Sequence, residues 1–284
     1  MTSSPAANET PVDGLRCLHT RPSSGDLTFV FVNALTGSTD QWEAVIAPAL
    51  RDQGYGTLSY NFRGQVETEY GAEDALDDAQ IVRDLHRVVS ERVTGRCVLV
   101  GLSIGGLFAA RAMKAGLACE GIVLINTLRK PGLALDWTNE AVFRASKLGG
   151  SQLVMDLFLP MLLGPEKLSE MRAACLGDSA YTPLDATSGI YRLIKRSRDV
   201  DWEFAWSNIE CPVLVVTGLR DRVFLDRNAV EEIKAEIADV EEIVLADAGH
   251  LIPIEQPEIL AGALQSFAER LSSQPHPAVE TDAS

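Results

Sequence analysis

Short apolar runs that alternate with amphipathic stretches constrain the possible folds of this chain more than any other feature. Six of these runs are rich in Val, Ile and Leu and mostly lack an apolar–polar alternation, as expected of strands with both faces buried. The runs lie at residues 27–32, 56–60, 97–100, 121–125, 213–217 and 242–245. The stretches between them carry apolar residues three and four positions apart, which is typical of amphipathic helices. The sequence therefore predicts an α/β fold, with a mostly parallel sheet and helices on both faces.

The predicted helices alternate with the strands along most of the chain. They span about residues 40–53, 73–93, 104–115, 226–238 and 257–271. Residues 131–208 break this order, since they contain no convincing strand and indicate several short helices with many aromatic residues. A segment of this length is too long for an ordinary loop. We expect it to form a helical cap over a pocket, the alternative being a helical flank that merely covers the sheet.

These patterns divide the chain into a core and a cap. We expect residues 13–130 and 209–271 to form the α/β core and residues 131–208 to form the cap. The two ends of the chain, residues 1–12 and 272–284, are rich in small and polar residues and are predicted to be disordered.

Composition excludes several classes of partner. A formal net charge of -15 would repel nucleic acid and anionic membrane surfaces. No apolar run approaches the roughly 20 residues that span a bilayer, and the first ten residues lack the features of a signal peptide, so we expect a soluble, cytoplasmic protein. The five cysteines are odd in number and scattered, which favours free thiols over disulfides or a metal site. No sequence feature indicates an oligomeric state.

A serine between glycines follows the run at 97–100, in the sequence GLSIG at residues 101–105. A sharp turn from strand to helix holds its central residue in a strained conformation and needs small neighbours. Such a turn would present the Ser103 hydroxyl at the carboxyl edge of the sheet, where the first N–H groups of the next helix stabilise an oxyanion. The motif predicts Ser103 as a nucleophile.

A serine nucleophile needs a base, and His250 is the best placed of the four histidines. It follows the last predicted strand through a turn of small residues, so it lies at the same edge of the sheet as Ser103. The others are His19, which precedes a polar loop, His86 in a charged helix and His276 in the terminal tail, and we expect their side chains to be exposed.

The third member of a catalytic triad is a carboxylate that orients the histidine. Asp221 follows the strand at 213–217 and gives the chain order Ser, Asp, His. Asp226 and Asp247 remain alternatives, although Asp226 is better placed to cap the following helix and Asp247 to shape the turn before His250.

Together these motifs resemble the α/β-hydrolase superfamily over residues 25–270. The matching segments are GYG at 54–56 leading to NFRG at 61–64, GLSIGG at 101–106, CPVLVVTG at 211–218 with Asp221, and AGH at 248–250 followed by EQPE at 255–258. The resemblance implies an eight-stranded sheet, a helical cap after the sixth strand and no cofactor. It also implies an oxyanion hole made by the backbone N–H groups of Ile104 and Leu35.

Two positions depart from the usual pattern of this superfamily. Asn33-Ala34 stands where most members have His-Gly, and Asn61 stands where an aspartate is usual. The 3-oxoadipate enol-lactonases also lack His-Gly and are similar across residues 33–42, 101–107 and 126–127 with Lys130. This likeness implies a small anionic substrate, and Arg129 and Lys130 are candidates to meet its carboxylate, the alternative being two solvated charges at the base of the cap.

The sequence as a whole favours a serine hydrolase that acts on a small-molecule carboxylic ester, thioester or lactone. Trp137 and the other aromatic residues of the cap are candidates to line an apolar pocket, the alternative being that they form the core of the cap. Two other functions stay open: transfer of the acyl group to another acceptor or cleavage of a carbon–carbon bond by the same triad, and a ligand-binding role without catalysis.

Overall fold

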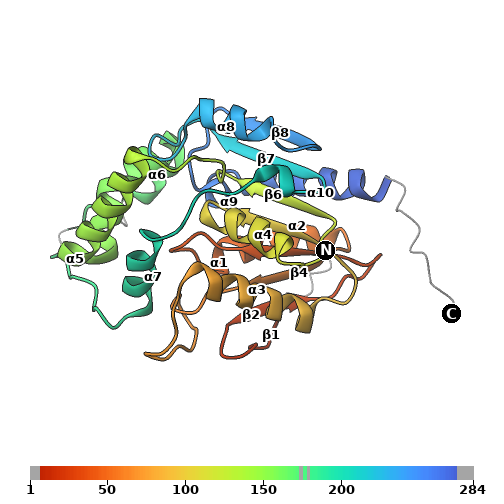
Figure 1. The fold of residues 1–284 in the computed structure, drawn as a ribbon, viewed down its shortest axis with the longest axis horizontal. Helices are drawn as coiled ribbons and strands as arrows, with labels where there is room; N and C mark the ends of the chain where they lie inside the picture. Colours follow the sequence, from red (N-terminus) through yellow and green to blue (C-terminus); the bar gives the residue numbers. More distant parts are fainter. Residues whose placement is uncertain (1–6, 173–174, 178–179, 274–284) are drawn as a thin grey trace.

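An eight-stranded sheet runs through the centre of the computed structural model, which describes residues 7–172, 175–177 and 180–273 (Figure 1). The strand order is β1-β2-β4-β3-β5-β6-β7-β8. The six strands from β3 to β8 are parallel to their neighbours, whereas β2 is antiparallel to β4 and β1 is antiparallel to β2. The strands are β1 (Asn8–Glu9), β2 (Cys17–Thr20), β3 (Leu27–Val32), β4 (Gly56–Tyr60), β5 (Arg96–Leu102), β6 (Gly121–Ile125), β7 (Val213–Gly218) and β8 (Val240–Leu245).

All six predicted strands are present, with bounds that differ by at most two residues. The two antiparallel strands, β1 and β2, were not predicted, because they are too short and too mixed in polarity to show a period. β1 lies inside the segment predicted to be disordered, so the prediction is wrong at Asn8–Glu9. The last helix likewise continues through residues 272–273. The prediction is also wrong at residues 10–12, where the N–H of Thr10 donates to the carbonyl oxygen of Cys17 and Val12 is buried. Residues 1–6 and 274–284 lie outside the described residues.

Helices cover both faces of the sheet, as predicted. One face packs against α3, α4 and α8, and the other against α1, α2, α9 and α10. The prediction of one helix over residues 40–53 is wrong, because α1 and α2 are separate, and α9 was not predicted because it is only four residues long. The helices of the core are α1 (Asp40–Glu43), α2 (Ile46–Asp52), α3 (Asp78–Arg92), α4 (Ile104–Lys114), α8 (Arg227–Lys234), α9 (Ile252–Glu255) and α10 (Pro257–Ser273).

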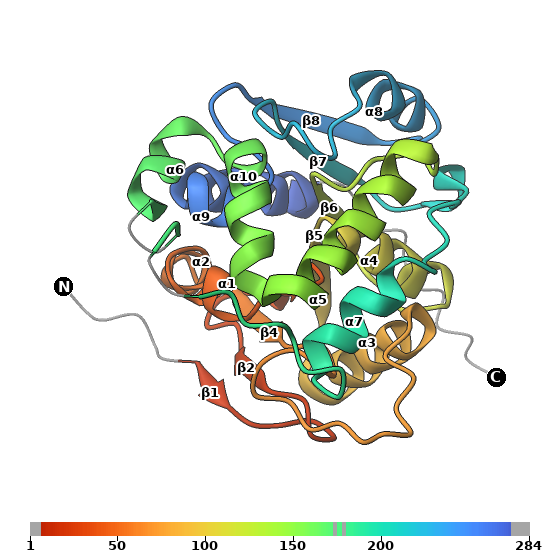
Figure 2. The ribbon, with the colours of Figure 1, turned by 90° about the vertical axis from the view of Figure 1, so that its left-hand side faces the viewer.

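Three further helices lie between β6 and β7 in the chain and in front of the sheet in Figure 2. They are α5 (Leu133–Leu162), α6 (Pro165–Met171) and α7 (Gly189–Ser197), and a short 3-10 helix (Trp206–Asn208) follows them. All lie within residues 131–208, the segment predicted to form a cap. α5 is broken in its middle, where Gly149 and Gly150 have non-helical backbone angles.

Two glycine-to-alanine substitutions, one at the break in α5 and one inside α10, should change stability in opposite directions. Gly150 has φ +67°, and a Cβ atom there would lie 2.2 Å from the carbonyl oxygen of Thr182. We expect Gly150→Ala to lower the free energy of unfolding by about 1–3 kcal/mol. Gly262 lies inside α10 with open space around it, and we expect Gly262→Ala to raise that free energy by up to about 1 kcal/mol. Urea denaturation of the two variants measures both changes, and equal effects would contradict this account.

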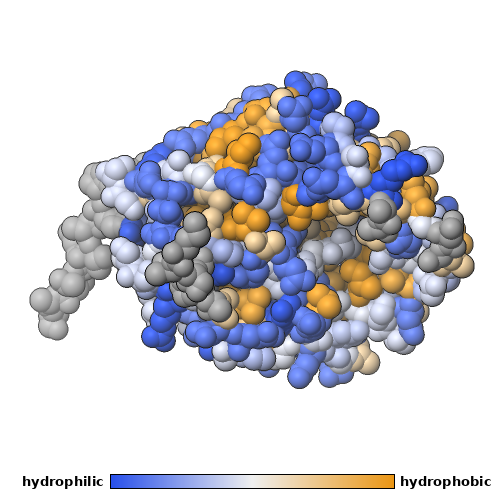
Figure 3. Space-filling view, turned by 180° about the vertical axis from the view of Figure 1, so that it is seen from behind, coloured by the Kyte–Doolittle hydropathy of each residue, from blue (hydrophilic) through white to orange (hydrophobic). Residues whose placement is uncertain are grey.

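The surface mixes hydrophobic and hydrophilic residues, which form separate patches in the view from behind (Figure 3). Several large hydrophobic side chains are exposed on α5, namely Leu133, Trp137, Leu148, Leu157 and Met161. Among the described residues, no helix combines the length and the apolar character that crossing a membrane requires.

Candidate active site

Ser103 occupies the sharp turn between β5 and α4. Its backbone angles, φ 57° and ψ -124°, are rare for a residue other than glycine. The turn is tight: a Cβ atom on Gly101 would lie 2.3 Å from the backbone of Gly106, and one on Gly105 would lie 2.3 Å from the carbonyl oxygen of Val32. The glycines around Ser103 are therefore required by the close approach of the chain, and the strained turn places Ser103 at the carboxyl end of β5.

His250 and Asp221 form a buried pair at the same edge of the sheet. His250 Nδ1 lies 2.6 Å from Asp221 Oδ2. The other carboxylate oxygen, Asp221 Oδ1, accepts hydrogen bonds from the N–H groups of Val223 at 3.0 Å and Phe224 at 2.9 Å. Burial raises the pKa of Asp221, but its interaction with His250 and the two backbone donors outweigh burial, and the pKa falls below its usual value. Asp221 is thus held as a carboxylate that orients the imidazole.

The two alternative carboxylates have other roles. Asp226 accepts hydrogen bonds from the N–H groups of Asn228 and Ala229 and so caps α8, as expected. Asp247 is exposed and forms an ion pair with Arg220. Neither contacts His250 in the described structure, which leaves Asp221 as its partner.

The loop that carries His250 is fixed from two sides. Glu255 accepts hydrogen bonds from the N–H groups of Gly249 and Leu251, the residues that flank the histidine. The N–H of His250 donates to the carbonyl oxygen of Leu162 at the end of α5, over 2.6 Å. Sequence reasoning recorded Glu255 only as part of a motif, because its contacts with a loop depend on how α9 folds back.

Asn126 and Thr127, directly after β6, connect the separate parts of the site. The Asn126 side chain donates to the carbonyl oxygens of Gly249 and His250 and accepts from the N–H of Gly218. Thr127 Oγ1 donates to the carbonyl oxygen of Ser103 over 2.9 Å. These two residues therefore hold the serine turn and the histidine loop in register, a role that sequence reasoning missed.

The Ser103 hydroxyl has an unexpected neighbour. Arg129 Nη2 donates a hydrogen bond to Ser103 Oγ over 3.1 Å. No hydrogen bond joins Ser103 to His250 within the described residues, so the serine and the histidine–aspartate pair share an edge of the sheet but are not linked in this conformation. Ser103 is only 8% exposed.

The structure separates Arg129 from the two other predicted substrate-binding residues. Lys130 is half-exposed and forms an ion pair with Glu232 of α8. Trp137 is 74% exposed on the first half of α5. Of the three predicted residues, only Arg129 forms a hydrogen bond with Ser103 in the described structure.

The remaining histidines lie away from this edge. His19 is in β2 and only partly buried, and His86 Nε2 is 3.0 Å from the carbonyl oxygen of Ala112, so neither is the freely exposed side chain that was predicted. His276 lies outside the described residues. Among the described residues, no group of three or more His, Cys, Asp and Glu side chains is arranged to hold a metal ion.

The loop after β3 is fixed by a buried network of amide side chains. Asn33 Nδ2 donates to Asn61 Oδ1 at 3.1 Å and to Gln65 Oε1 at 3.0 Å, and Asn33 Oδ1 accepts from Trp42 Nε1 at 2.7 Å. Gln65 Nε2 in turn donates to the carbonyl oxygens of Ala34 and Leu35. The two unusual asparagines thus contact each other, and Gln65 holds the backbone of the loop that was predicted to carry an oxyanion donor.

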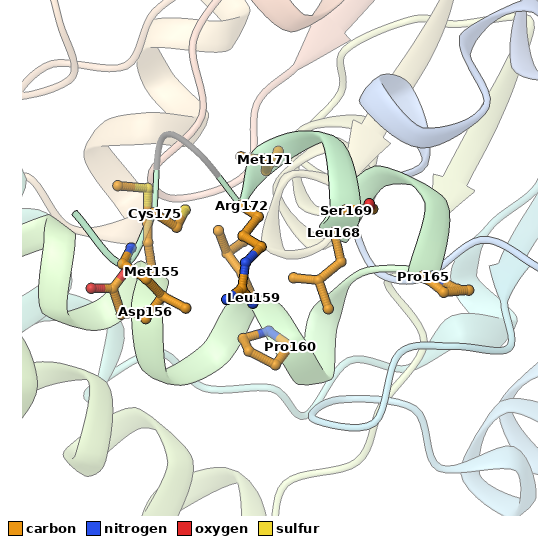
Figure 4. Close-up of a pocket in the computed structure, with 11 residues that line it drawn as sticks. Met155, Asp156, Leu159, Pro160, Pro165, Leu168, Ser169, Met171, Arg172 and Cys175 are labelled. Carbon is orange, nitrogen blue, oxygen red and sulfur yellow. The ribbon is translucent and has the colours of Figure 1, made fainter.

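A cavity of about 480 Å³ opens between α5, α6 and the segment after α6, apart from the residues described so far (Figure 4). Its wall is mainly apolar and comes from the second half of α5, from α6 and from the segment after α6. The lining residues are Met155, Asp156, Leu159, Pro160, Pro165, Leu168, Ser169, Met171, Arg172, Cys175 and Leu176. None of them is Ser103, Asp221 or His250.

Comparison with known proteins agrees with this fold. Residues 29–263 match the model of the alpha/beta hydrolase family, which is most of the chain. The chain belongs to the α/β-hydrolase family. A related sequence, from Variovorax paradoxus strain S110, carries the provisional name of carbamate hydrolase RutD. It is 22% identical to this α/β-hydrolase over 261 residues, which cover 90% of this chain and 97% of the relative.

Solved structures share the fold of this α/β-hydrolase. An esterase from Exiguobacterium antarcticum superposes with a TM-score of 0.73 at 18% identity, covering 93% of this chain and 99% of the esterase. The enol-lactonase from Burkholderia xenovorans LB400 superposes with a TM-score of 0.72 at 19% identity, covering 92% of this chain and all of the lactonase. At these identities the structures establish the fold and leave the substrate to be inferred from the site.

The amide network predicts a large loss of stability when Asn33 of this α/β-hydrolase is replaced by alanine. The change leaves the buried Trp42 Nε1 without an acceptor and removes one of the two hydrogen bonds that Asn61 Oδ1 and Gln65 Oε1 each accept. We expect the free energy of unfolding to fall by about 2–4 kcal/mol, measured by urea denaturation. The control Asn228→Ala changes an exposed residue and should cost less than about 0.5 kcal/mol. Equal effects of the two substitutions would show that the network adds no stability.

Proposed function

We propose that this α/β-hydrolase is a serine hydrolase that cleaves a carboxylic ester, thioester or lactone of a small substrate through an acyl-enzyme on Ser103. The observation that carries the proposal is the 2.6 Å contact between His250 Nδ1 and Asp221 Oδ2 at the edge of the sheet where the strained turn presents Ser103. A buried carboxylate on Nδ1 places the free lone pair of the neutral imidazole on Nε2, which is the atom that a general base needs.

The proposed reaction has two halves. Ser103 Oγ attacks the substrate carbonyl while His250 Nε2 takes its proton, and the imidazolium then protonates the leaving group. The backbone N–H groups of Ile104 and Leu35 would stabilise the oxyanion; Gln65 supports the second by holding the carbonyl oxygen of the same residue. Water then attacks the acyl-enzyme with His250 again as base, which releases the acid and restores Ser103.

The relatives support attack on a carbonyl carbon without identifying the substrate. By their printed names, one is a carbamate hydrolase, one an esterase and one an enol-lactonase. All three names denote hydrolysis of a bond to a carbonyl carbon, the step that an acyl-enzyme on Ser103 would perform. An ester, thioester or lactone fits this step with oxygen or sulfur as the leaving atom.

The proposal is tested with a fluorophosphonate probe and a substrate panel. We expect the probe to label the folded protein at Ser103, localised by peptide mass spectrometry, and expect turnover of at least one member of a panel of short esters, thioesters and lactones. Product analysis with and without an added alcohol or amine separates hydrolysis from acyl transfer. A folded protein that the probe leaves unlabelled would instead indicate a ligand-binding role.

A further inference from the structure

Arg129 is built into the catalytic edge rather than projecting into solvent. It follows β6 by four residues and is only 6% exposed. Besides Ser103 Oγ, its Nη2 donates to the carbonyl oxygen of Asn126 over 2.8 Å. The guanidinium is therefore anchored on the same segment that connects the serine turn with the histidine loop.

Two aromatic rings hold the plane of this guanidinium. The carbon at its centre lies 4.5 Å from the ring centroid of Trp202 and 4.5 Å from that of Phe224. The ring of Phe224 also lies 4.9 Å from the ring of His250. Arg129 is thus stacked between the cap segment that carries Trp202 and the loop that carries Asp221, beside both the nucleophile and the base.

Arg129 forms no ion pair with a carboxylate in the described residues, and the one carboxylate that acts on its charge from a distance, Asp221, is itself paired with His250. The two other arginines that are equally buried are both paired: Arg51 with Glu43 at 2.8 Å, and Arg63 with Asp84 at 3.1 Å. The protein has 40 acidic residues from which a partner could have come. Burying a cation without an ion-pair partner costs free energy. A buried arginine of this kind beside Ser103 therefore points to an anionic ligand that pairs with it.

One nitrogen of the Arg129 guanidinium is available to donate hydrogen bonds to a ligand. Its Nε and Nη2 have partners, whereas Nη1 donates no hydrogen bond to the described residues. Burial lowers the pKa of Arg129 to about 10, so the group stays protonated at neutral pH. A carboxylate can therefore accept a hydrogen bond from Nη1, and it gains a second one from Nη2 once substrate takes the place of Ser103 Oγ at that donor.

We propose that Arg129 binds a carboxylate of the substrate, and that this hydrolase selects esters in which the carboxylate lies within about two to four carbon atoms of the scissile carbonyl. The limit follows from the 3.1 Å between Nη2 and Ser103 Oγ, because an acyl group bonded to Oγ leaves only a short span to the guanidinium. Half-esters of short dicarboxylic acids fit this span. The inference rests on the proposed function, since it names the substrate class of the same site.

The test compares two ethyl esters of nearly equal shape, monoethyl succinate and ethyl butyrate, by proton release in a pH-stat. The wild-type enzyme should favour the half-ester by about 100-fold in kcat/KM, and Arg129→Met should reduce that ratio to near one. Arg129→Lys keeps the positive charge but loses the planar guanidinium, so the ratio of kcat/KM between the two esters should fall about tenfold. This variant provides the test if Arg129→Met does not fold. Lys130→Met is the matched control, because the structure pairs Lys130 with Glu232, and should leave the ratio within about threefold.

The kinetic constants of the Arg129 variants distinguish a substrate-binding role from a purely structural one. If Arg129 binds the substrate carboxylate, its replacement raises the KM for the half-ester far more than for ethyl butyrate. If Arg129 only supports the structure, its replacement lowers kcat equally for both esters. Equal losses for the two esters, or a wild-type enzyme without preference for the half-ester, would overturn the proposal while leaving the hydrolase function intact.

A binding measurement separates this inference from the proposed function. Calorimetry on the Ser103→Ala protein should show monoethyl succinate binding at least tenfold more tightly than ethyl butyrate. Adding Arg129→Met to that protein should remove the difference. Binding that depends on Arg129, together with no turnover by the wild-type protein, would uphold the anion site and overturn the hydrolase. Binding that does not depend on Arg129 would overturn the anion site.

Discussion

Replacement of Ser103 by alanine is expected to lower the rate of ester hydrolysis by about 10⁵- to 10⁶-fold. The activity that remains comes from substrate binding and the oxyanion hole. The loss is this large because no acyl-enzyme forms without Oγ. Alanine keeps the small volume that the turn demands, so the fold should survive. The measurement is kcat/KM on the best ester of the panel, with circular dichroism to confirm folding.

Ser90→Ala is the matched control for this substitution. Ser90 is exposed on α3, outside the catalytic edge, and its replacement should change kcat/KM by less than about twofold. Hydrolysis by the Ser103→Ala protein at the wild-type rate would remove Ser103 from the mechanism, whatever its backbone conformation.

Replacement of Asp221 by asparagine is expected to lower kcat by about 10⁴-fold with the fold retained. Asp221 Oδ2 accepts the proton on His250 Nδ1, and an amide group that donates there would place the proton on Nε2 instead. His250 would then have no lone pair facing the serine. Asp247→Asn is the matched control, because Asp247 is exposed and paired with Arg220, and it should change kcat by less than about threefold. Comparable losses in the two variants would reject Asp221 as the orienting residue.

The lowered pKa of Asp221 also predicts how this substitution changes stability with pH. A carboxyl group whose pKa is lower in the folded state stabilises the fold above its unfolded pKa of about 3.8, and that contribution disappears as the pH falls through the folded value. Asp221→Asn removes the contribution. Its destabilisation relative to wild type should therefore be complete above about pH 5 and should shrink below about pH 4, as measured by urea denaturation across this range.

Sequence reasoning located β3 to β7 because these strands are buried on both faces and five or more residues long, which leaves an apolar run in the sequence. β8 is a largely exposed edge strand, and only its last four residues were predicted. β1 and β2 were not predicted because strands of two to four residues with mixed polarity show no such pattern. The pair formed by His250 and Asp221 could be predicted because each residue follows a predicted strand, β8 and β7, and the carboxyl ends of parallel strands meet at one edge of the sheet.

The rest of the site depended on side-chain directions that no local pattern encodes. Arg129 looked like one of two adjacent charges, and only the folded chain shows one buried against Ser103 and the other paired with Glu232. Likewise, Asn33 and Asn61 appeared as two separate departures from the family pattern. They are one change in physical terms, because the two amides are hydrogen-bond partners across neighbouring strand ends.

The end of α5 has a consequence for engineering. Its carbonyl groups at Met161 and Leu162 accept hydrogen bonds from the N–H groups of Arg222 and His250, so the last turn of a cap helix is part of the scaffold of the acid and histidine loops. A chimaera that imports a whole cap from another hydrolase would replace these acceptors along with the substrate-facing surface. Junctions placed before residue 161 should exchange specificity while the loops that carry Asp221 and His250 keep the contacts they have here.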